Sequence, residues 1–316
     1  MSNVEPDARM ITISEVERET GIAKETLRVW ERRYHFPNPS RDANGERIYT
    51  AEQRVRLQLI KRLIDHGYRP GKIVNLPAEE LTELSQLVAR KSSIPPPDES
   101  DPMLTECMAL IAGHRVVELR QAMVQAQLRL GLRSFVTDLV APLTTLVGDA
   151  WADGRLAIFE EHLFAETLQG VMRAAIFTAS QQNDRDMATP RILLTTVPME
   201  RHGLGLLMAE ALFALEGASC ISLGVQTPLA DIVAATRVHR ADVVALSFSS
   251  GISCRAALDN IAQLKERLGG RAEVWVGGAC AAQLLRQLGP ECVLDLHGIA
   301  AAVARWRTSN TVELAG

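Results

Sequence analysis

The spacing of apolar side chains divides the chain into three blocks. Residues 10–90 are rich in charge and carry apolar residues at helical spacing. Residues 103–182 follow the same spacing, with turn signals at 131–133 and 152–154, which predicts a helical bundle. From residue 191 onward, short β-rich runs alternate with helical stretches, which predicts a parallel sheet covered by helices on both faces.

Two polar stretches separate these blocks. RKSSIPPPDESDP at 90–102 contains three consecutive prolines and predicts a stiff linker, and QQNDRDMATP at 181–190 precedes the strands. We therefore expect domains at 1–90, 103–184 and 185–316, with residues 91–102 as the linker. We expect a disordered tail over 307–316. The predicted strands cover residues 191–196, 218–223, 242–248, 272–278 and 291–296.

The composition is typical of a soluble globular chain, with 47% hydrophobic and 23% charged residues. Charged residues interrupt every apolar run before the ~18 residues that a membrane span needs. The polar, acidic N-terminus does not resemble a signal peptide. The cysteines form no CxxC pair, which argues against a disulfide framework and a thiolate metal site. We expect a cytoplasmic protein with no membrane partner; the five cysteines are at 107, 220, 254, 280 and 292.

Positive charge is concentrated near the N-terminus. The chain has a net charge of −4, but residues 18–72 contain 13 Lys and Arg against 7 Asp and Glu. A basic segment attached to an acidic body indicates an anionic partner for that segment alone. Nucleic acid is the first candidate.

The basic block has the pattern of two short helices followed by a hairpin. Ser14 is the expected N-cap of the first helix and Gly21 its end. KETLRVWERRYHF forms the second helix, with Leu27, Trp30 and Tyr34 on one face and Lys24, Arg28 and Arg32 on another. PNPSRDANGERIYT predicts a hairpin that turns at Asn44-Gly45, and a third helix covers 51–66. This is the plan of a winged helix-turn-helix.

The same block resembles the MerR family of winged-helix DNA-binding domains over roughly residues 10–76. TLRVWERRY matches the recognition-helix signature and PSRDANGERIYT matches the wing. The resemblance implies that the chain binds double-stranded operator DNA. The expected DNA-binding residues are Lys24, Arg28, Arg32, Arg41, Arg47 and Tyr49, whereas Leu27 and Trp30 are expected in the core.

A second cluster of polar residues follows the first strand of the last block, in TVPMERHGLG at 196–205. Glu200, His202 and Gly205 fall between a strand and a helix, at the carboxyl edge of the predicted sheet, where ligands bind. A histidine there can hold a metal, and a nearby carboxylate can accept its other ring proton, fixing its tautomer.

This stretch resembles the DxHxxG motif of cobalamin-binding domains, in which the histidine is the lower axial ligand of cobalt. Residues 206–246 separate Gly205 from Ser247-Phe-Ser249, and residues 250–276 precede Gly277-Gly278, in the register of that family. The resemblance implies that His202 binds cobalt, that Gly205 lets the backbone approach the corrin, and that Ser247 and Gly277-Gly278 accommodate the nucleotide tail. Two positions depart from the pattern: Glu200 replaces Asp, and Ser249 replaces the Leu of methionine synthase-like members.

The bundle carries a third motif, Trp151 followed after nine residues by Glu161-His162. This spacing, and the order of the three domains, resemble the CarH/LitR-type photoreceptors, in which the bundle covers the upper face of adenosylcobalamin. The resemblance implies that Trp151, Glu161 and His162 contact that cofactor. In some members a histidine after the tryptophan takes the upper cobalt position after photolysis, but here that residue is Ala152.

These observations predict a multidomain α and α/β protein: a winged helix-turn-helix, a four-helix-type bundle and a flavodoxin/Rossmann-like parallel sheet. The predicted function is a light-sensing repressor of carotenoid or other photoprotection genes. Its adenosylcobalamin-bound homotetramer would bind DNA in the dark and dissociate on photolysis. One alternative is a light-insensitive regulator that senses cobalamin. A second is a corrinoid methyl-transfer subunit, which the MerR-like segment argues against, and we expect no enzyme activity.

Overall fold

The computed structural model describes residues 10–65, 68–91, 101–152, 154–181, 189–249, 252–278, 281–289 and 291–313. Within these residues the chain forms two compact units. The first comprises the N-terminal segment up to residue 96, called the head below, and residues 149–156. The second comprises residues 97–148 and 157–316. Of the predicted linker at 91–102, residues 92–100 lie outside the described residues. Its ends differ from the prediction, because residue 91 is the last of a helix and residues 101 and 102 are the N-cap and first residue of the next.

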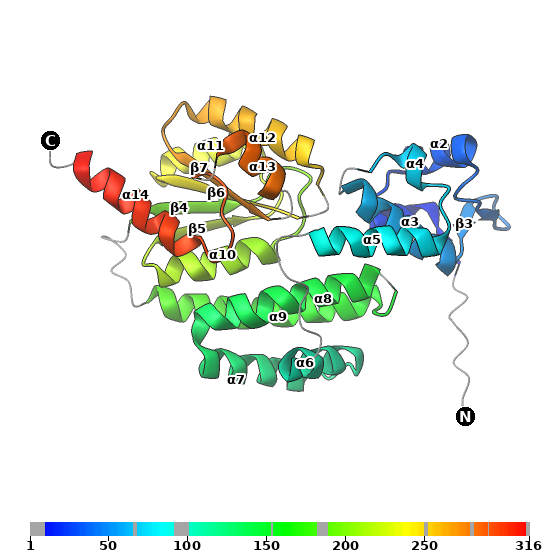
Figure 1. Ribbon diagram of the computed structural model, residues 1–316, viewed down its shortest axis with the longest axis horizontal. Coiled ribbons are helices and arrows are strands. Elements are labelled where there is room, and N and C mark those ends of the chain that lie inside the picture. Colours follow the sequence, from blue (N-terminus) through cyan, green and yellow to red (C-terminus); the bar gives the residue numbers. More distant parts are fainter. Residues whose placement is uncertain are drawn as a thin grey trace. The chain divides into compact units, whose positions relative to one another are not determined.

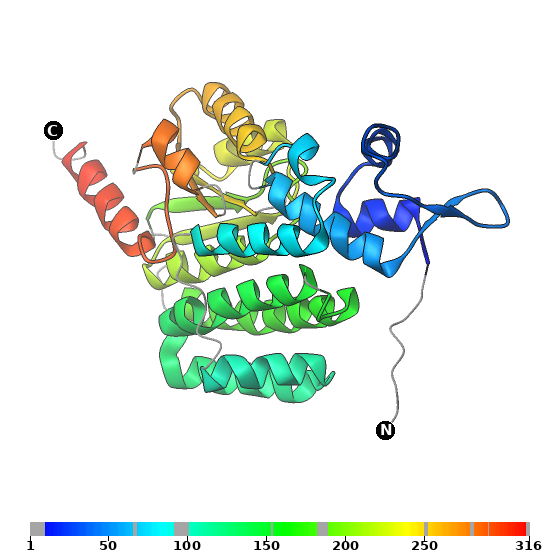
Figure 2. The same ribbon diagram turned by 45° about the vertical axis from the view of Figure 1, so that its right-hand side comes forward.

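The head combines a small antiparallel sheet with helices, and its elements follow one another as predicted. Strands β2 and β3 form the predicted hairpin, which extends from the helices in Figure 2. Gly45 closes its turn with φ 77°, a conformation that favours glycine. The winged helix-turn-helix is thereby confirmed. Its elements are β1 (Ile11–Thr12), α1 (Ile13–Thr20), α2 (Lys24–Tyr34), β2 (Ser40–Arg41), β3 (Arg47–Tyr49), α3 (Ala51–Asp65), α4 (Pro70–Ile73) and α5 (Ala78–Lys91).

The start of α1 differs from the prediction. Thr12, and not Ser14, is the N-cap: its hydroxyl accepts a hydrogen bond from the Glu15 backbone N–H, and the Glu15 carboxylate accepts one from the Thr12 N–H. This reciprocal pair is a capping box, which satisfies two N–H groups that the helix itself cannot. The S/T-x-x-E spacing from Thr12 to Glu15 was present in the sequence, and the prediction of Ser14 was wrong.

The second unit begins with the predicted helical bundle, formed by α6 (Pro102–Ala112), α7 (Val116–Ser134), the π-helical turn η1 (Phe135–Val140), α8 (Ala141–Ala152) and α9 (Ile158–Ser180). Gly131 interrupts α7 with φ 75° and ψ 161°, at the turn signal seen in the sequence. Helices α6 and α7 both pack against α9, which therefore lies at the centre of the bundle.

One helical run of the described chain, Val116–Trp151, is apolar and long enough to pass a test for a membrane span by length and composition alone. The pattern of charged residues had predicted no such stretch. The run is divided by Gly131 and by η1. Side chains such as Met123, Phe135 and Leu139 are buried, as expected for the core helices of a bundle.

The sheet of the second unit is parallel, with the strand order β5-β4-β6-β7. This is the order of flavodoxin-like folds. In Figure 1, α10 covers one face and α11 and α12 the other. The elements are β4 (Arg191–Thr195), α10 (Leu204–Leu215), β5 (Ser219–Gly224), α11 (Leu229–Val238), β6 (Val243–Phe248), α12 (Cys254–Leu268), β7 (Glu273–Gly278), α13 (Ala281–Leu288) and α14 (Ile299–Glu313).

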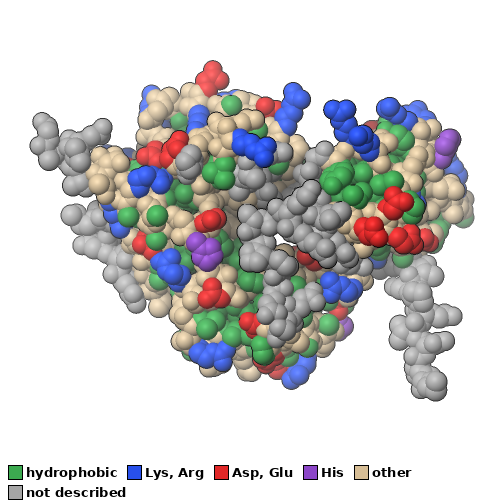
Figure 3. All heavy atoms as spheres, in the orientation of Figure 1, with side chains coloured by type: hydrophobic (Ala, Val, Ile, Leu, Met, Phe, Trp, Pro, Cys, Tyr) green, Lys and Arg blue, Asp and Glu red, His purple; other side chains and the backbone are tan. Residues whose placement is uncertain are grey.

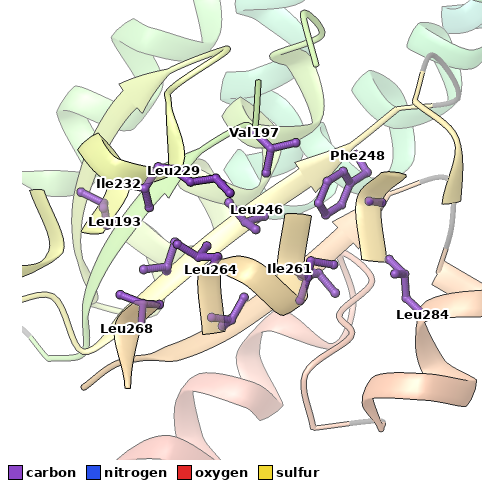
Figure 4. Packing of buried hydrophobic residues seen from close by; sticks show 14 of the residues in the cluster. Leu193, Val197, Leu229, Ile232, Leu246, Phe248, Ile261, Leu264, Leu268 and Leu284 are labelled. Atoms are coloured by element: carbon purple, nitrogen blue, oxygen red, sulfur yellow. The ribbon is translucent and has the colours of Figure 1, made fainter. Parts of the chain in front are cut away.

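Helix α10 contacts both the sheet and α9. Its sequence, LGLLMAEALFAL, is apolar on nearly every face, as expected of a helix with neighbours on two sides. On the opposite face of the sheet, strand residues such as Leu193 and Leu246 pack against Ile232 and Leu264 of α11 and α12 (Figure 4). Both faces of the sheet are therefore buried, which accounts for its nearly continuous hydrophobic strands.

Three predictions for the last block need correction. The segment 291–296 is not a strand: it makes a single parallel bridge, between Val276 and Val293. The tail is helical up to Glu313 in α14, and Arg307 donates hydrogen bonds to the carbonyls of Thr189 and Glu216. Cys254 is disulfide-bonded, whereas Cys107, Cys220 and Cys292 are free.

We predict that Thr12→Ala destabilises α1 by about 1 kcal/mol, because the capping hydroxyl is lost. Ser14→Ala is the matched control, since Ser14 is exposed and does not cap the helix. Hydrogen exchange of the full chain should show faster exchange of the α1 amides in Thr12→Ala alone. Equal exchange in the two variants would contradict the assignment of the cap.

Candidate functional site

A buried carboxylate organises the loop between β4 and α10. Glu200 is 1% exposed. Its Oε1 accepts hydrogen bonds from the backbone N–H and the ring Nδ1 of His202, both at 2.9 Å. Ser249, which follows β6, donates its backbone N–H to Oε2 at 2.8 Å and its hydroxyl to the two carboxylate oxygens at 2.9 Å. The structure thus brings Glu200, His202 and Ser249 together at the carboxyl ends of neighbouring strands.

These contacts set the charge of Glu200 and the tautomer of His202. Burial, the largest single influence, raises the pKa of Glu200, but the hydrogen bonds from His202 and Ser249 outweigh it and leave the pKa lowered. An ionised carboxylate can only accept hydrogen bonds, so Nδ1 of His202 carries the proton. The other ring nitrogen, Nε2, then presents its lone pair, as a metal ligand must.

The His202 ring is well placed to meet a ligand from solvent, because its side chain is 67% exposed while its carboxylate partner is buried. Met199, one residue before Glu200, has φ 74° and is 77% exposed. A left-handed conformation is unusual for methionine and marks a constrained loop. Val225, in the loop after β5, is 41% exposed. The exposed side chains of Met199 and Val225 give this edge of the sheet an apolar surface that a planar ligand can cover.

The glycines of the motif make room for neighbouring protein atoms. A Cβ on Gly205 would lie 2.7 Å from Oγ of Ser247, so the first turn of α10 packs closely on the end of β6. A Cβ on Gly278 would lie 1.9 Å from the carbonyl oxygen of Phe248, and Gly278 has φ 109°. A Cβ on Gly277 would lie 3.0 Å from the Leu294 carbonyl oxygen. The ends of β6 and β7 therefore approach as closely as they do because position 278 is glycine, and Gly277 leaves room for the backbone at Leu294.

Three threonines that sequence reasoning did not single out brace the His202 loop. The Thr196 hydroxyl donates to the Glu200 carbonyl at 2.7 Å and accepts from the Gln226 N–H at 2.8 Å. Thr195 and Thr227 join their hydroxyls at 2.7 Å. These bonds link the loop after β4 to the loop after β5. Two threonines at the end of an otherwise apolar strand were the signal in the sequence.

Helix α9 carries two of the predicted side chains, and one of them, Glu161, is near enough to His202 to interact with it electrostatically. Burial raises the pKa of Glu161, and the nearby imidazoles of His162 and His202 oppose the increase. The His162 side chain is 68% exposed, with Nε2 3.6 Å from the Glu161 carboxylate. Trp151 lies in the last turn of α8, within the unit that contains the head. Its place over the site stays a prediction.

The described residues include no cluster of three or more His, Cys, Asp or Glu side chains that could hold a metal ion. His202 offers a single imidazole on a well-braced loop, beside exposed apolar side chains. A single imidazole suits a metal ion that is already coordinated by a planar organic ligand and takes only one further ligand from the protein. The residues present therefore fit a cobalt corrinoid, and the role of His202 as its ligand stays a prediction.

The head presents the second functional surface. Arg28, Arg32 and Arg41 are exposed and Lys24 is partly exposed. In the view of Figure 3, several Lys and Arg side chains of the head lie along its upper edge. Lys24 and Arg28 pair with neighbouring carboxylates on their own side of the head, and the guanidinium of Arg41 holds the Gly45 carbonyl at the tip of the wing.

Arg47 and Tyr49 differ from the other expected DNA contacts. Nε of Arg47 donates to Glu31 at 2.8 Å, which ties the wing to α2. Tyr49 is 1% exposed, in the head core with Leu27 and Trp30, and burial is the main cause that raises its pKa to about 12. Its ring packs beneath the wing and cannot reach a ligand on the surface of the head, so the prediction of Tyr49 as a DNA-binding residue was wrong.

Comparison with known families agrees with both surfaces. Residues 11–79 match the model of the MerR HTH family of regulatory proteins. Residues 104–176 and 190–310 match two models of B12-binding domains, one for the bundle and one for the sheet. The chain is thus a cobalamin-binding transcriptional regulator with a MerR-type DNA-binding head, and not an enzyme.

The chain matches two curated relatives over most of their length. The chain is 27% identical to the HTH-type transcriptional repressor CarH of Myxococcus xanthus, over 83% of this chain and 86% of the relative. It is 28% identical to the repressor CarA of the same organism, over 88% and 90% of the two chains. Among solved structures it is similar to a monomethylamine corrinoid protein of Methanosarcina barkeri, with TM-score 0.49, 15% identity, and coverage of 62% of this chain and 94% of that one.

We predict that Gly278→Ala destabilises the second unit by about 3 kcal/mol, because the new Cβ collides with backbone and the residue keeps a positive φ. Gly224→Ala is the matched control, with φ 78° and no atom within 4 Å of its added Cβ. Calorimetry should show an unfolding temperature lower by about 6–12 °C in Gly278→Ala. A smaller decrease is expected in Gly224→Ala. Equal decreases in the unfolding temperature would show that the positive φ alone accounts for the loss of stability, and that the close approach of Gly278 to Phe248 does not contribute.

Proposed function

We propose that this protein is a light-responsive repressor that binds operator DNA as an adenosylcobalamin-bound oligomer in the dark. The observation that carries the proposal is the bracing of His202 by Glu200 and Ser249, with Glu161 and His162 of α9 nearby. His202 would hold the cobalt from one side of the cofactor, and the polar side chains of α9 would contact the group that adenosylcobalamin carries on the other side. The similarity to CarH and CarA supports the same reading.

On the lower side, the chain's own residues prepare the ligand nitrogen. Glu200 holds the proton of His202 at Nδ1, which directs the Nε2 lone pair away from the carboxylate. Ser247 and the backbone at Gly277-Gly278 would accommodate the nucleotide tail of the cofactor. Met199 and Val225 would exclude water from beneath the ring. When bound, adenosylcobalamin supplies a cobalt–carbon bond that light breaks.

On the upper side, Glu161 would accept hydrogen bonds from the hydroxyls of the adenosyl ribose, and Trp151 would contact the base. Both contacts exist only while the adenosyl group is present. The bound and the photolysed forms therefore differ in the interactions that hold the bundle over the sheet, and such a difference can shift a two-state equilibrium. Loss of these contacts would cause the oligomer to dissociate into smaller species.

DNA binding would depend on the number of heads in the assembly. One small head neutralises few phosphates, so its affinity alone is low at physiological salt. Linked heads on a repeated operator gain affinity through their high effective concentration. A tetramer that disassembles in light would lose this gain, and the target genes would be expressed. Genes of photoprotection, such as those for carotenoids, are the proposed targets.

A light-insensitive cobalamin sensor is the second candidate, and one residue favours it. Ala152 follows Trp151, where some photoreceptors have a histidine that caps cobalt after photolysis. Alanine cannot ligate a metal. His162 of α9 is the other imidazole proposed for that position.

We predict that the chain, reconstituted with adenosylcobalamin in the dark, elutes in size-exclusion chromatography with light scattering as an oligomer that dissociates after green light.

His202→Ala should reduce cofactor affinity at least about tenfold. His239→Ala, an exposed histidine of the same unit, should change nothing. An oligomer of unchanged size in light would favour the cobalamin-sensing regulator, and no cobalamin uptake by the unmodified chain would overturn the site.

We predict that Arg32→Gln weakens binding to every DNA sequence and lowers the slope of log affinity against log salt by about 1, as expected for one lost phosphate contact. Arg32 is exposed on α2, so its replacement leaves the head core intact. Arg255→Gln, exposed on α12 of the other unit, is the control. Fluorescence anisotropy at several salt concentrations measures both. An unchanged slope for Arg32→Gln would remove this residue from the DNA interface.

A further inference from the structure

A hollow of about 380 Å³ lies at the edge of the sheet opposite to the His202 site. Two of its lining residues, Ala241 and Asp242, directly precede β6, whereas Ser249 follows the other end of that strand. A strand of six residues separates these two edges by roughly 20 Å. The hollow is therefore distinct from the candidate cofactor site, and its volume lies in the range of small-ligand sites.

The C-terminal ends of two helices form the walls of the hollow. Helices α11 and α12 pack side by side, and each contributes lining residues at or near its last turn (Figure 1). Val233 and Leu268, which are 8% and 2% exposed, form an apolar part of the lining. Arg237, Arg240 and Arg271 line the same hollow and are exposed. A ligand here would meet guanidinium groups beside an apolar surface.

Arg240 occupies a backbone position that usually takes glycine. It follows the last turn of α11 and has φ 50°. Its N–H donates to the Arg237 carbonyl, and the Ala241 N–H donates to the Thr236 carbonyl at 2.9 Å, which is the Schellman arrangement of a helix C-terminus. Helices α1 and α12 place glycine in the left-handed residue that ends them. In α11 an arginine stands there, although its Cβ is strained in this conformation.

The charges around the hollow match a dianion. Three arginines and Asp242 give the lining a net charge of +2. The Asp242 carboxylate accepts the Arg191 backbone N–H at 2.7 Å, so it is engaged at the start of β4. Among the residues that the structure describes, no salt bridge joins these arginines to a carboxylate. The planar N–H fork of a guanidinium matches the oxygens of a phosphate group.

The helix ends alone do not account for this set of arginines. A cation near a helix C-terminus offsets the negative end of the helix dipole. Arg271 has this role for α12, because its guanidinium donates to the Leu268 carbonyl at 3.4 Å. For α11, Arg237 already lies in the last turn. Arg240, in a strained position, adds a further cation that the dipole does not require.

We propose that this hollow binds a small phosphate monoester, whose dianion the three arginines hold while its organic part contacts Val233 and Leu268. The proposal does not rest on the proposed function, because the hollow lies at the other edge of the sheet and needs neither cobalt nor DNA. It gives the second unit a separate site for a phosphorylated compound of metabolite size. Such a ligand would stabilise the folded unit in proportion to its occupancy.

The test uses the full, cofactor-free chain and two probes that share a ring, phenyl phosphate and phenyl sulfate. At about pH 8 the phosphate is a dianion, whereas the sulfate is a monoanion, so the pair isolates the second charge. Isothermal titration calorimetry at low salt measures both affinities. We expect phenyl phosphate to bind at least about tenfold more tightly. Inorganic phosphate, which lacks the ring, should bind more weakly than phenyl phosphate.

Arg240→Gly is the decisive variant, because glycine suits a φ of 50° and preserves the end of α11. We expect its unfolding temperature to be unchanged or higher, while its affinity for phenyl phosphate falls roughly tenfold or more. Arg237→Ala should lose affinity to a similar extent. Arg267→Ala is the matched control: it removes the same charge from the last turn of α12, outside the hollow, and should change affinity by less than about twofold.

Three results would overturn the proposal. The first is no binding of phenyl phosphate by the unmodified chain, or equal affinity for the phosphate and the sulfate. The second is full affinity in Arg240→Gly. The third is an equal loss in Arg237→Ala and Arg267→Ala, since the general positive charge of this surface would then account for binding. Equal affinity for phenyl phosphate and inorganic phosphate would overturn the contact assigned to the organic part.

Discussion

The burial of one carboxylate is the constraint on which the rest of the site depends. An ionised Glu200 with 1% exposure is stable only if hydrogen bonds replace the water it has lost. Its donors come from two loops, one after β4 and one after β6, so both loops must be in place before the charge is satisfied. The orientation of His202 is therefore a consequence of the folding of the sheet edge, and it exists before any ligand binds.

Helix α10 gives this edge its relation to the bundle. It begins two residues after His202 and packs against both the sheet and α9. Because α10 is buried on two sides, a change in its position would disturb two hydrophobic contacts at once. The distance from His202 to Glu161 on α9 is set by this packing. The same helix thus makes the bundle and the sheet one compact unit.

Hydrophobic periodicity predicted the bundle and the alternation of strands and helices, because these patterns follow from which face each element buries. The hairpin at Asn44-Gly45 and the spacing from His202 to Gly278 were also visible, since turns and motifs are local in sequence. Contacts between distant segments were not visible. Neither the pairing of Ser249 with Glu200 nor the burial of Tyr49 has a local signal, and the apolar run at 291–296 gave no sign that it pairs through Val293 alone.

The two sides of the proposed cofactor site differ in how firmly protein contacts hold them. The lower side is braced by several hydrogen bonds around Glu200, whose side chain is buried. On the upper side, His162 is 68% exposed and lies 3.6 Å from Glu161, a weak contact in water. Because the hydrogen bonds around Glu200 join protein groups only, they would respond little to a change in the upper group of the proposed cofactor. Under the proposed function, the interactions of Glu161 and of Trp151 would depend on what occupies the site, so a signal would begin at these side chains.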